Sequence, residues 1–426
     1  MRTRTTYGVI AIVLLLVVAL IAIHGTGPSS PGPTPARSGA TGTLPTAIRT
    51  SAPSTVSVTA SPAPSPNFVL AGQLIEARED ASAVLLDDGR VLIVGGANYS
   101  DSGLDTTIAS AELFDPSVNE FFPSGWLIQA RADASATKLA DGRVLIAGGT
   151  VALTQSPWHE NLASAEIFDP MTGKFSTTGS LHIPRAGQSA TLLRDGNVLI
   201  EGGDSYFETE TFDAELYNPK TGKFTVIANS KVTGFRASPG ILLDNGKVLY
   251  FGSDINGGAL VGQTYNPTTK TFSLIGPTAI DHMYGVLSSA KLADGRVLVV
   301  GGDYATVDDP NYNRAEIYDP ATGTFTLTGA TTKSENFVNL VTLPSGRVLL
   351  VGGLLDDMTP GNIPIFDTSS EIYDPATGTF SDLQPMVESH YAATVTLLQD
   401  GRVLIAGGAG DTYSGPSRVA ELFWSK

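Results

Sequence analysis

The sequence predicts an all-β protein, a seven-bladed β-propeller with four antiparallel strands in each blade. The first observation is a nine-residue string at Asp141–Gly149 that recurs letter for letter at Asp400–Gly408. The second observation is the spacing of this string. Near copies bring the strings to seven, and the first glycines of their closing pairs lie 49 to 55 residues apart. A period near 50 residues is typical of repeat architectures such as propellers. The third observation is that each repeat contains four short segments separated by turn residues, as in a four-stranded meander.

The first two segments of each repeat predict an inner hairpin. The first segment is rich in small residues, as in Ala81–Leu86, and ends at an Asp-Gly, Asn-Gly or Ser-Gly pair. Glycine tolerates the positive φ of a tight hairpin turn. The second segment, as in Val91–Val94, is apolar throughout, which is typical of a strand buried on both faces. We expect first strands around the propeller axis and second strands between neighbouring blades. The Gly-Gly pair that follows either takes angles closed to other residues or lets the next blade approach closely.

The last two segments predict an outer hairpin. The third, as in Ala111–Asp115, carries a glutamate and an aromatic residue before an Asp-Pro or Asn-Pro turn. The fourth starts at a phenylalanine placed six residues after that Asp or Asn. These residues are Phe121, Phe175, Phe224, Phe272, Phe325 and Phe380. We expect the aromatic rings to fill the wedge-shaped gaps between blades.

The two ends of the repeat region predict how the ring closes. Ala420–Phe423 is a third segment with no fourth after it, while Phe68–Leu70 aligns with a fourth segment. We therefore expect Phe68–Leu70 to complete the seventh blade, so that the propeller covers residues 67–426 and leaves no open edge. The fourth repeat is the least regular, with Ser253 for the second glycine and Gln263 for the usual glutamate.

The N-terminal region predicts export. In residues 1–24, two arginines precede an uncharged apolar run from Gly8 to Ile23. This segment is either a transmembrane anchor or a cleaved signal sequence. The first alternative gives a single-pass protein of the cell membrane with the propeller outside, and the second gives a secreted protein. Residues 25–66, rich in Pro, Ser, Thr and Ala, predict a disordered linker.

Composition excludes several classes of partner and site. The 42 acidic and 26 basic residues give a net charge of −16, which argues against binding nucleic acid. Without cysteine there is neither a disulfide nor a thiolate metal site. We expect no cofactor, no metal and no catalytic residue of a recognised motif, and we expect a monomer.

The Gly-Gly pair followed by two aromatic positions resembles a kelch repeat. The Asp-Gly-Arg-Val-Leu variant resembles bacterial kelch proteins and the propeller domain of galactose and glyoxal oxidases. The resemblance implies a propeller that serves either a binder or an enzyme. It also implies where copper would bind in an oxidase. Tyr391 aligns with the tyrosine of a copper-ligating Tyr-His pair, but Ala392 takes the place of the histidine. The crosslinked cysteine of those enzymes is missing, and their third ligand lies in a domain beyond the propeller, whereas this sequence stops at Lys426. We therefore expect no copper-radical oxidase.

Loop lengths locate the candidate binding face. The connections after second and fourth strands lie on one face, here termed the long-loop face, and the short turns lie on the other, the turn face. Between the Gly-Gly pair and the third strand the connections vary from 8 to 16 residues. Variable loops on a rigid scaffold often carry function. The candidate ligand-binding residues on this face are Trp126, Trp158, His159, His182, His282, Tyr304, Asp308, Asp309, His390, Tyr391 and Tyr413. The aspartates are either ligands for a cation or hydroxyl group, or solvated turn residues.

Three arginines complete the list of candidates. Arg78, Arg131 and Arg185 each stand eleven residues before the glycine of their turn, and His390 has this position in the last repeat. A ring of arginines could hold a carboxylate-bearing ligand. Alternatively, they pair internally with the glutamates of the third strands, such as Glu112 and Glu166. The sequence thus predicts a membrane-anchored binding protein for a carbohydrate or a protein. The alternative is an exported carbohydrate-active enzyme with an oxidase- or hydrolase-like site at the channel mouth.

Overall fold

The computed structural model describes residues 67–99, 106–152, 159–203, 213–233, 239–254, 260–279, 284–303, 313–333, 335–336, 338–355, 365–366, 368–410 and 415–424. The chain divides into two units, residues 1–63 and 64–426. The expected anchor and linker, residues 1–66, lie outside the described ranges. Within those ranges, no helix is long and apolar enough to span a bilayer.

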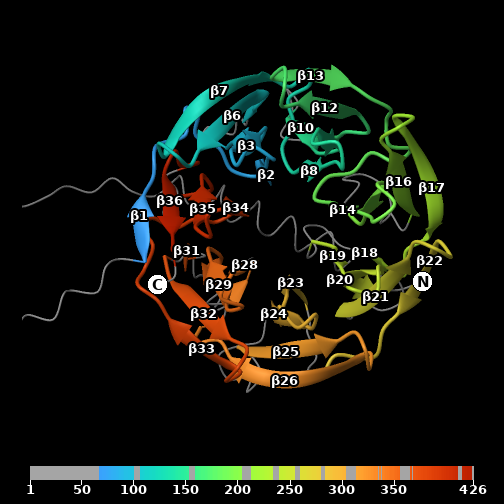
Figure 1. The fold of residues 1–426 in the computed structure, drawn as a ribbon, viewed down its shortest axis with the longest axis vertical. Coiled ribbons are helices and arrows are strands. Elements are labelled where there is room, and N and C mark those ends of the chain that lie inside the picture. Colours follow the sequence, from blue (N-terminus) through green and yellow to red (C-terminus); the bar gives the residue numbers. More distant parts are fainter. Residues whose placement is uncertain are drawn as a thin grey trace, which may run out of the picture. The chain divides into compact units, whose positions relative to one another are not determined.

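Seven sheets, formed by the described residues of the second unit, surround a common axis as the blades of a propeller (Figure 1). In blades 1 to 6 the strand nearest the axis comes first in the chain and the outermost strand comes last. The strands of blades 1 to 3 are β2 (Ser82–Leu85), β3 (Val91–Val94), β6 (Ser110–Asp115) and β7 (Glu120–Trp126); β8 (Ser135–Lys138), β9 (Val144–Ala147), β12 (Ala165–Asp169) and β13 (Lys174–Thr177); β14 (Ser189–Leu192), β15 (Val198–Glu201), β16 (Asp213–Asn218) and β17 (Lys223–Asn229).

The remaining blades repeat this order. Their strands are β19 (Ile241–Leu242), β20 (Val248–Asp254), β21 (Leu260–Asn266) and β22 (Thr271–Leu274); β23 (Tyr284–Lys291), β24 (Val297–Asp303), β25 (Arg314–Asp319) and β26 (Thr324–Ala330); β28 (Asn339–Thr342), β29 (Val348–Val351), β32 (Ser370–Asp374) and β33 (Thr379–Asp382); β34 (Thr394–Leu397), β35 (Val403–Ala406), β36 (Ala420–Phe423) and β1 (Phe68–Leu70). Short strands lie in the connections: β4 (Ala97–Asn98), β5 (Thr106–Thr107), β10 (Thr150–Ala152), β11 (His159–Asn161), β18 (Val232–Thr233), β27 (Glu335–Asn336), β30 (Leu354–Leu355) and β31 (Ile365–Phe366). The predicted fold class is confirmed.

The N-terminal strand closes the ring as predicted. β1 pairs antiparallel with β36, with Phe68 opposite Phe423 and Leu70 opposite Glu421. The two phenylalanine rings lie 5.1 Å apart between centroids, and both side chains are buried. The first and last strands of the propeller therefore share one sheet, the seventh blade (Figure 1).

The second strands and the glycines after them hold neighbouring blades together. The four residues of β3 are all buried, and so are those of β9 and β35. Gly95 has a φ of 69°, and a Cβ on it would lie 2.3 Å from the carbonyl oxygen of Arg131 in the next blade. Both expected reasons for glycine therefore apply, because the backbone angle and the approach of the neighbour each exclude a side chain.

Aromatic pairs fill the wedges between blades as expected. Within blade 1, Phe114 and Phe121 lie 4.9 Å apart between ring centroids, in a tilted arrangement. Phe114 packs in one apolar cluster with Leu404 and Leu422 of blade 7. Equivalent pairs, such as Phe168 with Phe175, recur in the other blades. Such pairs contribute beyond their buried area because tilted rings place a positive edge against a negative face.

The Asp-Gly-Arg string explains the turn face. In blade 2, the carboxylate of Asp141 accepts the backbone N–H of Arg143 at 3.2 Å and pairs with its guanidinium at 2.7 Å. The intervening Gly142 has a φ of 84°. The pKa of Asp141 is lowered, and the largest cause is its side-chain hydrogen bond with Arg143. The pair is exposed, so it specifies the turn more than it stabilises the fold.

One buried hydroxyl group between blades gives a stability prediction. Tyr217 of blade 3 hydrogen-bonds Thr178 of blade 2 at 2.9 Å. Tyr265 occupies the same position in blade 4, but there Ile227 replaces the threonine. The hydroxyl of Tyr265 therefore has no hydrogen-bond partner among the described residues. We expect Tyr265→Phe to leave the free energy of unfolding unchanged or to raise it by about 1 kcal/mol, because a buried unpaired hydroxyl costs free energy.

Tyr217→Phe is the matched control. It removes the same atom where a partner exists, so it is expected to cost about 1 kcal/mol. Denaturant unfolding of both variants measures the difference. An equal loss in the two would show that the Tyr265 hydroxyl has a partner after all.

Candidate functional site

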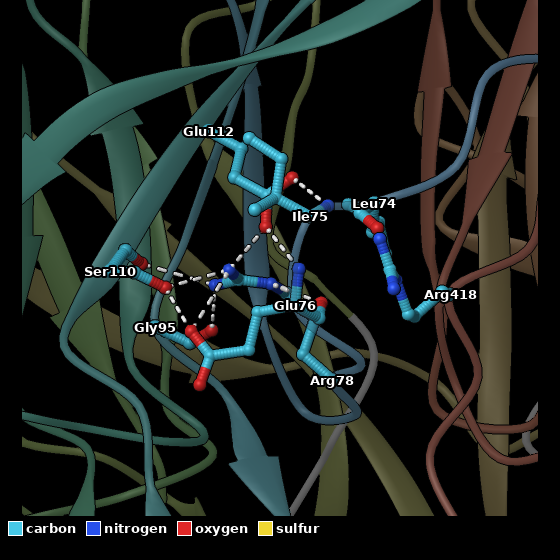
Figure 2. Close-up of polar contacts among 8 residues, drawn as sticks. All are labelled: Leu74, Ile75, Glu76, Arg78, Gly95, Ser110, Glu112 and Arg418. Carbon is cyan, nitrogen blue, oxygen red and sulfur yellow. Dashed lines mark hydrogen bonds and ion pairs between the residues drawn. The ribbon is translucent and has the colours of Figure 1, made fainter.

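The three candidate arginines lie at the long-loop ends of their blades, directly before the inner strands. Figure 2 shows the arrangement around Arg78. Its guanidinium donates to the carbonyl of Gly95 at 2.7 Å and pairs with the carboxylate of Glu112 at 2.6 Å. The same carboxylate accepts the backbone N–H groups of Ile75 and Glu76, at 2.7 and 3.1 Å. Glu112 therefore ties the connection from blade 7 to the third strand of blade 1.

The same group, here termed the latch, recurs in three further blades. It consists of the arginine or histidine before the inner strand and the glutamate of the third strand. The pairs are Arg78–Glu112, Arg131–Glu166 at 2.9 Å, Arg185–Glu215 at 3.2 Å and His390–Glu421 at 3.0 Å. In each, the glutamate also accepts two backbone N–H groups from the incoming connection. The alternative of internal Arg–Glu pairing accounts for all three arginines.

The three arginine latches also join their blades to the preceding blade through the backbone. The carbonyl of Arg131 accepts the N–H of Gly96 at 2.9 Å, and that of Arg185 accepts the N–H of Gly149 at the same distance. The carbonyl of Arg78 accepts Gly408 across the closure. The side chains of Arg78, Arg131 and Arg185 are at most 1% exposed. A role for them in ligand binding stays a prediction.

Two residues beyond the arginine or histidine of each latch, a backbone arc follows the start of the inner strands around the axis. Asp80, Asp133, Gly187 and Ala392 occupy this position, with φ between 50° and 64°. The N–H of Asp80 donates to the carbonyl of Ala392 at 3.2 Å, that of Asp133 to Asp80 at 3.0 Å, and that of Gly187 to Asp133 at 2.9 Å. The arc places two partly exposed aspartates at the long-loop end of blades 1 and 2.

An aromatic pair adjoins this arc. The rings of Tyr99 and His159 stack with centroids 6.2 Å apart and an interplanar angle of 18°. The hydroxyl of Tyr99 donates to the carboxylate of Asp80 at 3.1 Å. Tyr99 follows β4, and His159 begins β11, so the pair joins the long connections of blades 1 and 2. The N–H of Ala152 donates to the Thr107 hydroxyl at 2.8 Å and holds the same two connections together.

The other described candidates lie at separate places on the long-loop face. Trp126 ends the outer strand β7 with 70% of its surface exposed. His182 is half-exposed, and its Nδ1 lies 2.9 Å from the carboxylate of Glu215. His390 is buried in the latch of blade 7. Tyr391 follows it, and its carbonyl accepts the N–H of Ala409 at 2.7 Å.

His159 stacks on Tyr99, and Tyr99 in turn binds Asp80. Asp80 and Asp133 were missed because neither stands in a motif, although each follows a repeated arginine at the same distance. Trp158, His282, Tyr304, Asp308, Asp309 and Tyr413 lie outside the described residues. Among the residues with described positions, no group of three or more His, Cys, Asp or Glu is arranged to hold a metal ion.

Comparisons with known proteins bear on the fold. No family model matches the chain. A segment of 119 residues, 27% of this chain, is 32% identical to spermatocyte protein spe-26 of Caenorhabditis elegans, and it spans only 19% of that protein. A solved fungal alcohol oxidase of the AA5 family, in complex with copper, is similar with a TM-score of 0.57 and 19% identity, over 84% of this chain and 75% of that one.

A second solved structure, that of YjhT, is similar with a TM-score of 0.51 and 11% identity. The match covers 73% of this chain and 99% of YjhT. At such identities the likeness concerns the fold and not the chemistry. The chain is thus a seven-bladed propeller, similar in fold to a solved fungal alcohol oxidase of the AA5 family and to YjhT.

Proposed function

We propose that this protein is an extracytoplasmic binding protein whose long-loop face recognises a carbohydrate or a protein, with a carbohydrate as the favoured ligand. The observation that carries the proposal is the stacked pair of Tyr99 and His159, tied to Asp80 beside the propeller axis. Aromatic faces pack against the C–H groups of a sugar ring, and carboxylates accept hydrogen bonds from its hydroxyl groups. Asp133, one link further along the arc, adds a second carboxylate.

The setting of these residues supports the proposal. They stand on connections held by β4–β5 and β10–β11 pairing, above a ring closed by β1. A site held on rigid elements needs little ordering when the ligand binds, which favours affinity. Trp126, at the end of β7, presents a separate exposed indole at the rim of blade 1.

The proposal includes location. Residues 1–24 hold the protein at the cell membrane as a single-pass anchor, or are removed from a secreted form, and residues 25–66 act as the linker. The apolar run after two arginines supports this. The protein binds its ligand as a monomer and without a cofactor. Nucleic acid is not a partner because the chain carries a net charge of −16.

The test compares the two faces of the propeller by binding to a panel of oligosaccharides. We expect His159→Ala and Tyr99→Ala to weaken binding of the retained sugar about tenfold or more, because each truncates an aromatic contact worth over ~1 kcal/mol. Asp141→Asn, in a turn on the opposite face, is the control and leaves affinity unchanged. Isothermal titration gives the affinities. Binding that depends on Asp141 and not on the aromatic pair would show that the ligand uses the turn face.

One observation favours the enzyme alternative. Asp80 and Asp133 occupy consecutive links of the arc, and glycoside hydrolases act through a pair of carboxyl groups. Incubation of the protein with the retained oligosaccharide, followed by an assay for new reducing ends, tests this function. Release of product that is lost in Asp133→Asn would establish hydrolysis, and an unchanged ligand leaves binding as the function.

A further inference from the structure

The seam between blades 3 and 4 contains a buried carboxyl group in place of the latch. Glu201, at the end of β15, is 2% exposed. The position is apolar in other second strands, where Val94, Val300 and Val351 stand. Blade 4 in turn has Gln263 where six repeats have the latch glutamate or its equivalent. An acid has thus replaced an apolar residue at the same seam where an amide has replaced an acid.

The hydrogen bonds at this seam come from neutral donors. The side-chain amide of Gln263 donates to the carboxyl of Glu201 and, at 2.6 Å, to the hydroxyl of Ser230. The Ser230 hydroxyl donates to the carbonyl of Val232 at 2.7 Å, while it lies 3.4 Å from Glu201. Because the hydroxyl has one proton, its shorter bond to Val232 leaves the amide of Gln263 as the main donor to Glu201.

Among the described residues, the charged and titratable groups near Glu201 give it no ion pair of its own. On the blade 3 side, Arg185 pairs with Glu215, which also binds the ring of His182. Arg185 acts on Glu201 through its charge, but its ion pair is with Glu215. Tyr250 and Tyr265 stand on the blade 4 side. Burial is the largest cause that raises the pKa of both hydroxyl groups, and the nearby Glu201 contributes to the rise.

A buried carboxylate without its own cation is costly, so the proton is retained instead. Burial, as the largest cause, raises the pKa of Glu201 to about 8, against the opposing hydrogen bonds of Gln263 and Ser230. In the unfolded or opened chain the carboxyl returns to an ordinary value near 4.5.

We propose that the seam between blades 3 and 4 is a pH-responsive joint, closed while Glu201 is protonated and loosened on the long-loop face when it loses its proton. The loosened element is the connection Ser230–Thr233. This connection is held by Gln263, whose side-chain carbonyl oxygen accepts the N–H of Lys231 at 2.8 Å, and by pairing of β18 with β20. Ionised Glu201 competes for the amide proton that now reaches Ser230, and its charge draws water into the seam.

The sign of the pH dependence follows from the two protonation states. Below about pH 4.5 the carboxyl is neutral in both the closed and opened seam, and the stabilisation is fully present. Between about 4.5 and 8 only the closed seam keeps the proton, so opening is favoured about tenfold more for each pH unit. Above about 8 both states are ionised and the dependence levels off.

Hydrogen exchange of the whole chain, corrected for the intrinsic effect of pH on exchange, measures this opening. We expect protection at 230–233 and 248–251 to fall by about tenfold per pH unit from 5 to 8, while 91–94 in blade 1 stays level. Glu201→Gln and Glu201→Val, the latter restoring the apolar residue of other repeats, remove the dependence. Glu160→Gln, an exposed glutamate of the neighbouring blade, retains it.

Two results would overturn the proposal. One is a wild-type seam whose protection is independent of pH between 5 and 8. The other is the same pH dependence in either Glu201 variant as in the wild type. Valine is compatible with this strand position elsewhere in the ring, so the Glu201→Val variant keeps the test decisive where the glutamine variant folds poorly.

Discussion

Deleting residues 1–75 is expected to lower the free energy of unfolding by about 5 kcal/mol or more, whereas deleting residues 1–66 leaves it nearly unchanged. The longer deletion removes Phe68 and Leu74, which are buried at 4% and 0% exposure. Loss of a buried phenylalanine or leucine side chain costs about 2–5 kcal/mol each. It also exposes β36, whose outer edge β1 covers through three paired residues.

The shorter deletion is the matched control because it starts at Asn67 and keeps β1. Chemical denaturation compares the two proteins, and light scattering reports whether the opened edge of β36 promotes association. Phe68→Ala isolates the contribution of the ring that packs on Phe423. Equal stability of both truncated proteins would mean that the seventh blade does not need its fourth strand.

The strands were predictable from sequence because the repeat sets the same physical demand seven times. A second strand between two blades is apolar on both faces, so Val91–Val94 and its equivalents read as buried without ambiguity. Closure was equally predictable, because a third segment at the C-terminus and a fourth at Phe68 can only complete each other.

The site was less predictable because its geometry depends on contacts between blades. Arg78 could have faced a ligand or Glu112, and the choice is made by where the connection through Ile75 passes. Asp80 could not be predicted because its position depends on a left-handed backbone angle. Aspartate tolerates this angle better than most residues, but an aspartate in the sequence does not by itself indicate it. The sequence places Glu201 in a buried strand, and the effect of its carboxyl group depends on its contact with Gln263 of the next blade.

The arginine of a latch neutralises a buried glutamate, as Arg131 does for Glu166. Arg131→Met is expected to cost about 3–5 kcal/mol of unfolding free energy, because it leaves the buried carboxylate of Glu166 without a cation. The substitution also leaves the carbonyls of Gly148 and Ser164 without the donors that now lie 2.7 and 2.9 Å away. Arg143→Met is the control, since its partner Asp141 is exposed and such pairs contribute under ~1 kcal/mol.

A double substitution separates the buried charge from the lost hydrogen bonds. Adding Glu166→Gln to Arg131→Met removes the unpaired carboxylate, and Gln263 shows that glutamine can hold an incoming connection at this position. We therefore expect the double variant to recover part of the stability lost in the single one, a coupling that a double-mutant cycle measures. The cycle also decides between the two roles considered for these arginines. A guanidinium that serves the latch shows strong coupling to Glu166 and little effect on sugar affinity. Weak coupling with a large loss of affinity would instead assign Arg131 to the ligand.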